Sequence, residues 1–435
     1  MKNLPLQTQR KNSVISVLTV LFLCFNYSTF AFQDEIDFKQ YEGEVVDAEN
    51  NNPLVFATIS VAGTNISTIT NTEGDFLLKI PASVNNGTVV FSFIGYKTQK
   101  IPLSELSAQK NKIQLAASAL QLTGVDINIP KDAKALFRET LNKKGDNYFD
   151  DPTLMTAFYR ETIKKRKKNV SLSEAVVNIY KTPYSSNKKD AVELFKARKS
   201  TDYSKLDTVA LKLQGGPFNT LYVDIMKYPE YVFTDESIDD YKFTFDKFTR
   251  VNNRLIYIIN FDQLDEVKTP LYKGKLYIDA ENKTLTSAVY NLNITNRELA
   301  ARLFVRKKPA KVDVWPTEVA YRVDYRSKNG KWYYGYSNVL LEFKVDWDDK
   351  LFNSVYRMTA EMAITDWEKN EASKLPKFKE RLKKSIILSE EAIGFSDPDF
   401  WGQYNIIEPE KSIESAIKKI KRQLRRAKKS GTSKP

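Results

Sequence analysis

The sequence predicts a mainly β protein with some α structure: a small N-terminal β-sandwich, then a larger α+β domain with an extended antiparallel sheet. Three observations predict this fold class. The 435 residues are enough for two or three domains. Residues 41–115 alternate short β-like runs with turn signals, which is typical of a small sandwich. Residues 241–364 return to β-like runs, and in the clearest of them apolar and charged side chains alternate.

The first 31 residues predict a secretory signal that is cleaved after Ala31. Three basic residues precede an apolar run over residues 14–25, and small or polar residues follow it. About twelve apolar-rich residues are too few to cross a bilayer, which takes roughly 20. A retained N-terminal anchor is one alternative, and Cys24 raises a lipoprotein as another, although Leu23 stands where lipoprotein processing wants a small residue. We therefore expect a periplasmic protein, with peripheral contact to the outer membrane as a further expectation.

The residue types exclude several classes of enzyme. Histidine is absent and Cys24 is the only cysteine. Ser-His-Asp hydrolases, Cys-His proteases and zinc enzymes with histidine or thiolate ligands therefore lack their essential side chains. The acidic run Asp346-Trp347-Asp348-Asp349 lacks the glycine and the distal glutamate of an EF-hand and predicts a hairpin turn. We expect no metal site and no cofactor.

The net charge of +13 lies at the two ends of the chain. Residues 1–31 contribute +3 and residues 411–435 contribute +9, so that only +1 remains for residues 32–410. A nearly neutral body in an exported protein predicts no nucleic-acid partner.

The first module, residues 40–115, carries four recognisable motifs. They are Gly43-x-Val45-Val46-Asp47, Pro53-Leu54-x-x-Ala57-x-Ile59-x-Val61-x-Gly63-Thr64, Thr70-x-Thr72-x-Gly74-x-Phe76 and Phe91-Ser92-Phe93-Ile94-Gly95-Tyr96. Together they resemble the carboxypeptidase-regulatory-like domain of Bacteroidota envelope proteins. The resemblance implies a transthyretin-like sandwich of seven strands. It implies no carboxypeptidase activity, because this domain is an accessory of a separate zinc domain that needs histidine.

A linker over residues 116–130 leads into the α+β domain, residues 131–408. A helix is expected over residues 131–144, ended by Gly145, with its apolar face formed by Ala135, Leu136, Thr140 and Leu141. A β-hairpin is expected around the basic turn 164–169, and residues 210–231 predict a mixed helical or irregular segment.

The sheet of this domain is expected to contain seven further strands. Their predicted ranges are 241–248, 254–262, 272–279, 286–294, 318–327, 331–345 and 352–364. The pattern Gly274-x-Leu276-x-Ile278-Asp279, followed by Leu285 and Tyr290, is similar to repeats in periplasmic lipoprotein-carrier-like half-barrels. That resemblance implies a sheet that curls around an acyl chain, and the alternative is an ordinary meander with a turn at residues 281–283.

The tryptophans are the candidate ligand-binding residues. All five lie in the last third of the chain, at Trp315, Trp332, Trp347, Trp367 and Trp401. Trp315, Trp332 and Trp347 are predicted to line an apolar binding groove, and a tryptophan-rich core is the alternative.

Residues 409–435 predict a basic amphipathic helix and tail. The residues expected to contact a membrane or an acidic partner are Lys418, Lys419, Lys421, Arg422, Arg425 and Arg426. The alternative is a helix that docks its apolar stripe on the parent domain. Residues 397–409, just before it, resemble the closing segment of uncharacterised Bacteroidota proteins that carry the same first module.

The sequence therefore predicts an exported, non-catalytic binding or scaffold protein of the cell envelope. Its sheet domain is expected to recognise a protein partner or an apolar ligand such as a lipid. The alternative is a carboxylate-dependent hydrolase of envelope glycans, for which Asp279 and Asp324 are strand residues that a rigid sheet could display. A pair of acids in a deep cleft would favour the hydrolase, and an acid-free apolar groove would favour ligand binding.

Overall fold

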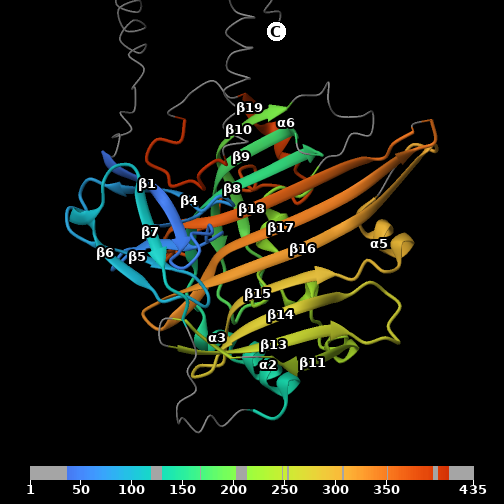
Figure 1. Cartoon of the computed structure of the whole chain (residues 1–435), viewed down its shortest axis with the longest axis horizontal. Helices are drawn as coiled ribbons and strands as arrows, with labels where there is room; N and C mark the ends of the chain where they lie inside the picture. The colour runs from blue at the N-terminus through green and yellow to red at the C-terminus, as the bar shows by residue number, and fades with distance from the viewer. Residues whose placement is uncertain are drawn as a thin grey trace, which may run out of the picture. The chain divides into compact units, whose positions relative to one another are not determined.

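The computed structural model describes residues 37–118, 130–166, 168–201, 213–246, 248–251, 254–305, 308–349, 351–394 and 400–410 (Figure 1). The expected signal segment lies outside these residues, and so does the expected basic helix and tail except for residues 409 and 410, which are not helical. Both therefore remain predictions, and so does the assignment of a contact role to Lys418, Lys419, Lys421, Arg422, Arg425 and Arg426.

The N-terminal module has seven strands in two sheets, as the sequence predicts. The strands are β1 (Phe38–Asp47), β2 (Thr58–Val61), β3 (Ser67–Ile69), β4 (Asp75–Pro81), β5 (Thr88–Ser92), β6 (Gln99–Pro102) and β7 (Asn111–Leu115), with a short 3-10 helix η1 (Leu103–Glu105) before β7. One sheet has the order β4-β1-β7 and the other β3-β2-β5-β6. Alternation places Ala57, Ile59 and Val61 in the core between the sheets. Gly74 occupies a turn at φ +81°, a conformation that glycine adopts without strain.

The α+β domain has one large sheet of twelve strands, in the order β11-β13-β14-β15-β16-β17-β18-β8-β9-β10-β19, with β12 paired to β13. Their bounds are β8 (Thr153–Lys165), β9 (Lys168–Lys181), β10 (Ala191–Thr201), β11 (Tyr241–Phe245), β12 (Thr249–Val251), β13 (Arg254–Gln263), β14 (Tyr272–Asp279), β15 (Thr284–Leu292), β16 (Val312–Lys328), β17 (Lys331–Trp347), β18 (Ser354–Lys369) and β19 (Ile393–Gly394). Adjacent strands are antiparallel except for β10 and β19, which are parallel. The hairpin predicted around the basic turn is β8–β9. The sheet is open, with β11 and β19 as its edges.

Short helices accompany this sheet. They are α2 (Ala133–Asn142), α3 (Lys144–Asn147), α4 (Phe218–Leu221), η3 (Pro229–Tyr231), η4 (Ser237–Asp240), α5 (Arg297–Phe304) and α6 (Leu388–Glu391). Asp132 caps the N-terminus of helix α2, because its side chain accepts a hydrogen bond from the backbone N–H of Ala135. The expected apolar face is partly wrong, because Ala133, Leu136 and Phe137 are buried whereas Ala135 is exposed. The helix also ends at Asn142, before the glycine expected to stop it.

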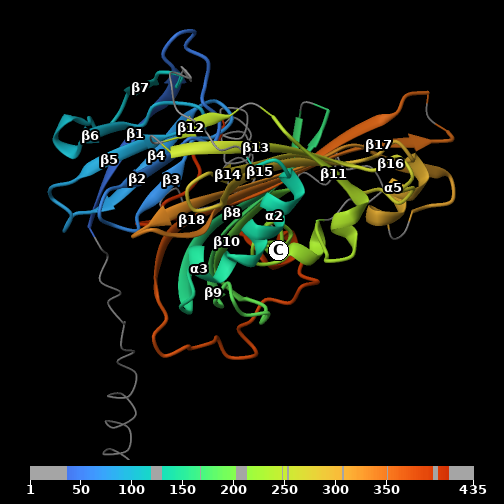
Figure 2. The same ribbon diagram turned by 90° about the horizontal axis from the view of Figure 1, so that it is seen from below.

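The two faces of the large sheet are covered by different parts of the chain, all within one compact unit that starts at Phe38. Helix α2 and residues 213–241 pack on one face (Figure 2). The sandwich and residues 400–410 pack on the other face, over Phe158 and Val176. In β8 the neighbours of Phe158, namely Ala157 and Tyr159, belong to the helical side, as the two-residue period of a strand requires.

Residues 400–410 join the sandwich to the sheet. The Asn405 side chain accepts a hydrogen bond from the backbone N–H of Lys79 at 2.7 Å and donates one to its carbonyl oxygen at 2.9 Å. On the sheet side, the Arg160 guanidinium donates to the carbonyl oxygen of Ile407 at 2.6 Å. Arg160 also forms a buried ion pair with Glu174 at 2.7 Å. The segment between these contacts therefore bridges both domains.

Candidate functional site

A cavity of about 630 Å³ lies between the helical side of the large sheet and the segments that cover it. Its floor consists of Tyr272 from β14, Tyr290 from β15, Val314 and Tyr321 from β16, Val339, Leu341 and Phe343 from β17, and Met358 and Ala360 from β18. Its cover consists of Leu213, Gln214, Phe218, Asn219, Tyr222, Val223, Tyr231, Val232, Leu303, Phe304, Val305 and Ile387.

Strand alternation produces the floor. In β17, the lining residues Val339, Leu341 and Phe343 are two positions apart and therefore point to the same side. Leu341 lies directly opposite Met358 in the antiparallel register of β17 and β18. Cross-strand neighbours of this kind place their side chains together on one face, so the strands form a continuous apolar surface.

The cavity is uncharged. No charged side chain is among the described residues that line it, and only Gln214 and Asn219 bring amide groups. Burial raises the pKa of Tyr290 and Tyr321, so both phenols stay neutral at physiological pH. Burial also raises the pKa of Tyr222 to about 12, and the buried hydroxyl of this residue has no hydrogen-bond partner in the described part of the chain. The site thus offers an apolar surface with an unused polar group at its cover.

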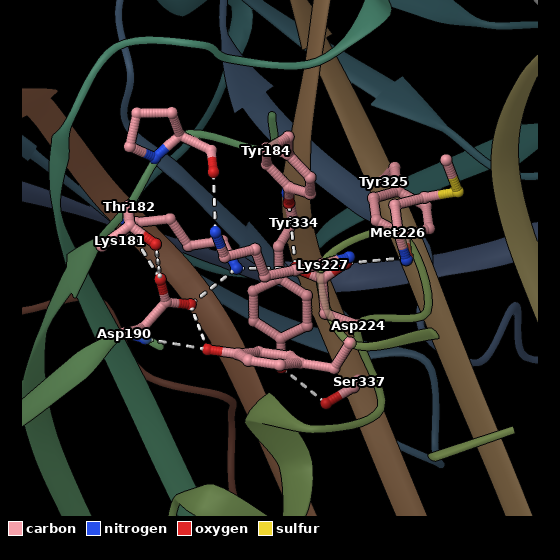
Figure 3. A network of polar contacts seen from close by, with 12 residues as sticks. Lys181, Thr182, Tyr184, Asp190, Asp224, Met226, Lys227, Tyr325, Tyr334 and Ser337 are labelled. Atoms are coloured by element: carbon pink, nitrogen blue, oxygen red, sulfur yellow. Dashed lines mark hydrogen bonds and ion pairs between the residues drawn. The ribbon is translucent and has the colours of Figure 1, made fainter. Parts of the chain in front are cut away.

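A buried polar network anchors the cover to the sheet (Figure 3). Asp224, just after α4, accepts hydrogen bonds from the Tyr184 hydroxyl at 3.0 Å and from the Tyr325 hydroxyl at 2.9 Å. The Lys181 ammonium group lies 2.7 Å from Asp224 and 2.9 Å from Asp190. Burial lowers the pKa of Lys181, but the two carboxylates outweigh burial and leave that pKa raised. The lysine therefore stays charged and holds both carboxylates.

Further contacts fix the segment on either side of Asp224. The Ser337 hydroxyl donates to the carbonyl oxygen of Thr220 at 2.8 Å. The Lys227 ammonium group donates to the carbonyl oxygens of Pro183 and Ser186, each at 2.6 Å. Each contact joins residues far apart in the sequence, so the cover has a defined position over the floor.

This network is a structural anchor. The side chains of Lys181, Asp190 and Asp224 are 2%, 0% and 0% exposed. None of the three is among the described residues that line the apolar cavity, the hollow at residues 42–44 or the cavity near Trp332. A substrate would therefore have to displace the cover to reach these carboxylates.

The structure does not bring the three predicted tryptophans into one cavity. Trp315 lies under the Arg297 guanidinium, whose carbon is 3.1 Å from the ring centroid. Trp347 packs against the apolar cluster that contains Phe343, at the end of the cavity floor. Trp332 lines a different cavity, near the sandwich. The assignment of a ligand to these residues stays a prediction.

The tyrosines of the floor were missed by the sequence reasoning. Tyr290 and Tyr321 stack with ring centroids 5.1 Å apart, and Tyr272 meets Tyr290 edge-on at 5.4 Å. Tyr290 belongs to the half-barrel pattern described above. Each of the three successive strands β14, β15 and β16 carries a tyrosine among its inward-facing apolar residues, and this recurrence could have predicted the aromatic floor from the sequence.

The strand carboxylates considered for hydrolysis have local partners. Asp279 accepts hydrogen bonds from the backbone N–H groups of Glu281 and Asn282, each at 3.0 Å, and so fixes the predicted turn. Asp324 accepts from the Arg322 guanidinium at 2.7 Å. Among the described residues, no cluster of three or more acidic, histidine or cysteine side chains is placed to hold a metal ion.

Comparison with known proteins supports the assignment of the first module. Residues 41–127 match the family model described as CarboxypepD_reg-like domain. No curated protein matches the chain. In the part of the chain that the structure describes, no helix has the length and apolar character needed to cross a membrane.

Solved structures give only distant likenesses. An outer membrane lipoprotein-sorting protein domain from Vibrio parahaemolyticus has 10% identity and a TM-score of 0.25, covering 57% of this chain and 96% of that one. A DUF1329 family protein from Desulfovibrio piger has 8% identity and a TM-score of 0.23, covering 55% and 93%. MucB has 11% identity and a TM-score of 0.19, covering 53% and 93%. These TM-scores are too low to transfer a fold or a function.

Proposed function

We propose that this chain is a non-catalytic binding protein that holds an apolar ligand, such as a lipid acyl chain, in the cavity beneath residues 213–232. The observation that carries the proposal is the uncharged lining of a cavity of about 630 Å³. This volume lies within the range of small-molecule sites, roughly 300–1,000 Å³. A chain of about ten methylene groups would gain up to about 8 kcal/mol by leaving water, before the costs of ordering it.

The polar group of the ligand is proposed to lie under the cover. The Tyr222 hydroxyl is buried and unpartnered, and a buried polar group without a partner costs about 1–3 kcal/mol. A carboxyl, ester or alcohol oxygen of the ligand would accept its hydrogen bond. The arrangement therefore suits an amphipathic molecule better than a pure hydrocarbon.

We further propose that the protein acts in the envelope of a Bacteroidota cell, as a periplasmic protein delivered by the signal in residues 1–31. The match of residues 41–127 to a CarboxypepD_reg-like domain supports this setting. Contact with the outer membrane or an acidic partner is proposed for the basic residues between Lys418 and Arg426. A protein partner in place of the lipid is the alternative that the sequence also predicts for the sheet domain.

The glycan hydrolase is not favoured by the two cavities that the large sheet lines. Among the described residues, the apolar cavity has no acidic lining residue, and Asp324 is the single acid that lines the cavity near Trp332. Hydrolysis by two carboxylates needs them about 5–10 Å apart across a bound sugar. A hollow on the sandwich does contain several acids, but Lys112 pairs with one of them, Glu44, at 3.5 Å.

The test is titration of the full chain with a fluorescent fatty acid, using two matched variants. Leu341→Glu puts a carboxylate into the cavity lining. Leu340→Glu makes the same change at the adjacent half-buried residue, which points to the other side of β17. We expect saturable binding by the wild type and by Leu340→Glu, and at least about a tenfold loss for Leu341→Glu, since a charge in an apolar site is costly.

Two outcomes would overturn the proposal. One is a folded wild-type protein that fails to bind the fatty acid and releases no lipid in native mass spectrometry. The other is equal binding by the two variants, which would place the ligand elsewhere. Release of reducing sugar from envelope glycans by the purified protein would favour the hydrolase instead.

A further inference from the structure

A second cavity, of about 370 Å³, lies between the sandwich and the large sheet. Its sandwich wall includes Thr58 and Ser60 from β2 and Ser92 from β5. Thr58 and Ser92 are direct cross-strand partners, and Ile59 between the two β2 residues points into the sandwich core. The wall therefore presents a row of hydroxyl groups.

The sheet wall of the same cavity is cationic. It includes Arg254, Arg322, Arg326 and Lys328, against the single acid Asp324. Arg322 pairs with Asp324 at 2.7 Å. Arg254 pairs at 3.5 Å with Asp279, which lies outside the lining. Arg326 and Lys328 have no carboxylate at ion-pair distance among the described residues, so the wall carries an excess of positive charge.

Arg326 is held in place across the sheet. Its guanidinium donates to the carbonyl oxygen of Ile364 at 2.8 Å and to the Ser67 hydroxyl. Gly335 on β17 makes room for it, because a Cβ atom there would lie 2.7 Å from the Arg326 Cγ. Burial lowers the pKa of Arg326, and the nearby Tyr333 and Asp324 oppose that shift. A cation that is desolvated without a counter-ion is costly, and a bound anion would remove the cost.

Two N–H donors of this wall have no acceptor among the residues that the structure describes. The Arg326 Nη2 atom and the Trp332 Nε1 atom are both buried and unpartnered, and both residues line the cavity. Buried donors are almost always satisfied in folded proteins, so two orphans at one cavity need an explanation. Both are donors, and both would be satisfied by a ligand rich in acceptor oxygens.

We propose that this cavity binds an oxyanion carried by a saccharide, that is, a phosphorylated or carboxylated sugar. The cations of β16 neutralise the oxyanion, and charge-assisted hydrogen bonds of this kind are the stronger ones. The hydroxyl groups of Thr58, Ser60 and Ser92 hydrogen-bond the sugar hydroxyls. The Trp332 ring supplies the apolar surface on which a sugar face packs. The site is separate from the apolar cavity, and its existence does not depend on the function proposed for that cavity.

Calorimetric titration of the full chain tests this proposal with four probes: glucose 6-phosphate, glucuronate, glucose and inorganic phosphate. We expect glucose 6-phosphate or glucuronate to bind, more weakly at 300 mM than at 20 mM salt, and glucose not to bind. We expect inorganic phosphate to bind more weakly than the anionic sugar, because it cannot use the hydroxyl wall. Binding of inorganic phosphate as tightly as the sugar would overturn the saccharide part of the proposal.

Two variants and one control locate the site. Arg326→Gln removes the unpaired charge and is expected to weaken binding about tenfold or more. Ser60→Asp places a carboxylate opposite the cations without removing any hydrogen bond described for Ser60. It is expected to abolish binding in a protein that melts at the wild-type temperature or above. Arg302→Gln removes the same charge from an exposed pair with Glu298 and should change nothing.

Measuring fatty-acid binding beside sugar binding separates this proposal from the one made for the apolar cavity. Fatty-acid binding should be the same in the wild type and in Ser60→Asp, whatever its strength. Failure of both anionic sugars to bind the folded wild type would overturn the proposal. So would unchanged binding in Ser60→Asp, since that carboxylate would stand where the oxyanion is proposed to lie.

Discussion

Glu161 gives the sharpest test of the energetics of the sheet. It lies in the middle of β8, opposite Ser173 on one side and Ala360 on the other, and it is buried. Burial raises its pKa from 4.5 to about 7, although the hydroxyls of Tyr159 and Ser173 oppose the shift. The Tyr159 hydroxyl donates to the carboxylate at 2.9 Å. Ionised Glu161 is therefore a poorly compensated buried charge.

The sign of the effect follows from proton linkage. Below pH 4.5 the carboxyl group is protonated in both the folded and the unfolded chain, so burial of the charge costs nothing. Between pH 4.5 and 7 the folded chain keeps a proton that the unfolded chain releases, so the free energy of unfolding falls as the pH rises. The full difference between the two pKa values is worth about 3 kcal/mol.

The substitution Glu161→Gln removes the ionisation and keeps the shape. We expect the stability of this variant relative to the wild type to rise by about 3 kcal/mol between pH 4 and pH 8. Urea unfolding followed by circular dichroism at four pH values measures it. The matched control is Glu371→Gln, an exposed residue, for which the difference should stay within about 0.5 kcal/mol. A Glu161→Gln difference that is flat to within about 1 kcal/mol over this range would refute the reasoning.

Three further substitutions test the anchor, a helix cap and a close strand approach. Asp224→Asn leaves Lys181 with one carboxylate in a buried site. We expect urea unfolding to show that the free energy of unfolding falls by about 3 kcal/mol or more, and a fall below about 1 kcal/mol would contradict the anchoring role. Asp132→Ala removes the side-chain acceptor for Ala135 and should cost about 1 kcal/mol in the same assay, whereas an unchanged midpoint would show that the cap is dispensable. Gly274→Ala places a methyl group against a carbonyl oxygen of β15 and should lower stability by about 1–3 kcal/mol, and a thermal melt at or above the wild-type temperature would contradict that contact.

The strands with regular alternation were predictable from the sequence. The range predicted for β14, residues 272–279, matches the structure, and the ranges of the neighbouring strands differ mainly at their ends. Strand β10 was missed because Ala191–Thr201 mixes apolar with basic residues and has a register shift between Leu194 and Lys196. A bulge changes which face each residue occupies, so the two-residue period is lost in the sequence although the strand forms.

The cover of the apolar cavity was less predictable. Helix α4 has four residues, too few to show a helical period. Its position depends on Asp224, whose partners Lys181 and Tyr325 lie 43 and 101 positions away. Sequence patterns report local propensity and carry no signal for such distant pairs. The segment could therefore be recognised as mixed, but its role in closing a cavity could not.

The charged face of β16 illustrates a property that alternation in the sequence cannot predict, namely whether water or another domain covers the face. In β16 the apolar residues Val323 and Tyr325 point to the helical side, and the charged residues Arg322, Asp324 and Arg326 alternate with them along the strand. Such a face is normally exposed to water, but here the sandwich covers it and Arg326 loses its hydration without gaining a carboxylate. Alternation thus predicts which side chains share a face. It does not predict whether another domain covers that face, and such a cover determines the cost of removing the charged side chains from water. The same polar row that looks like ordinary surface in the sequence lies under the sandwich, where Arg322 keeps Asp324 as its partner and Arg326 is desolvated without a carboxylate at ion-pair distance among the described residues.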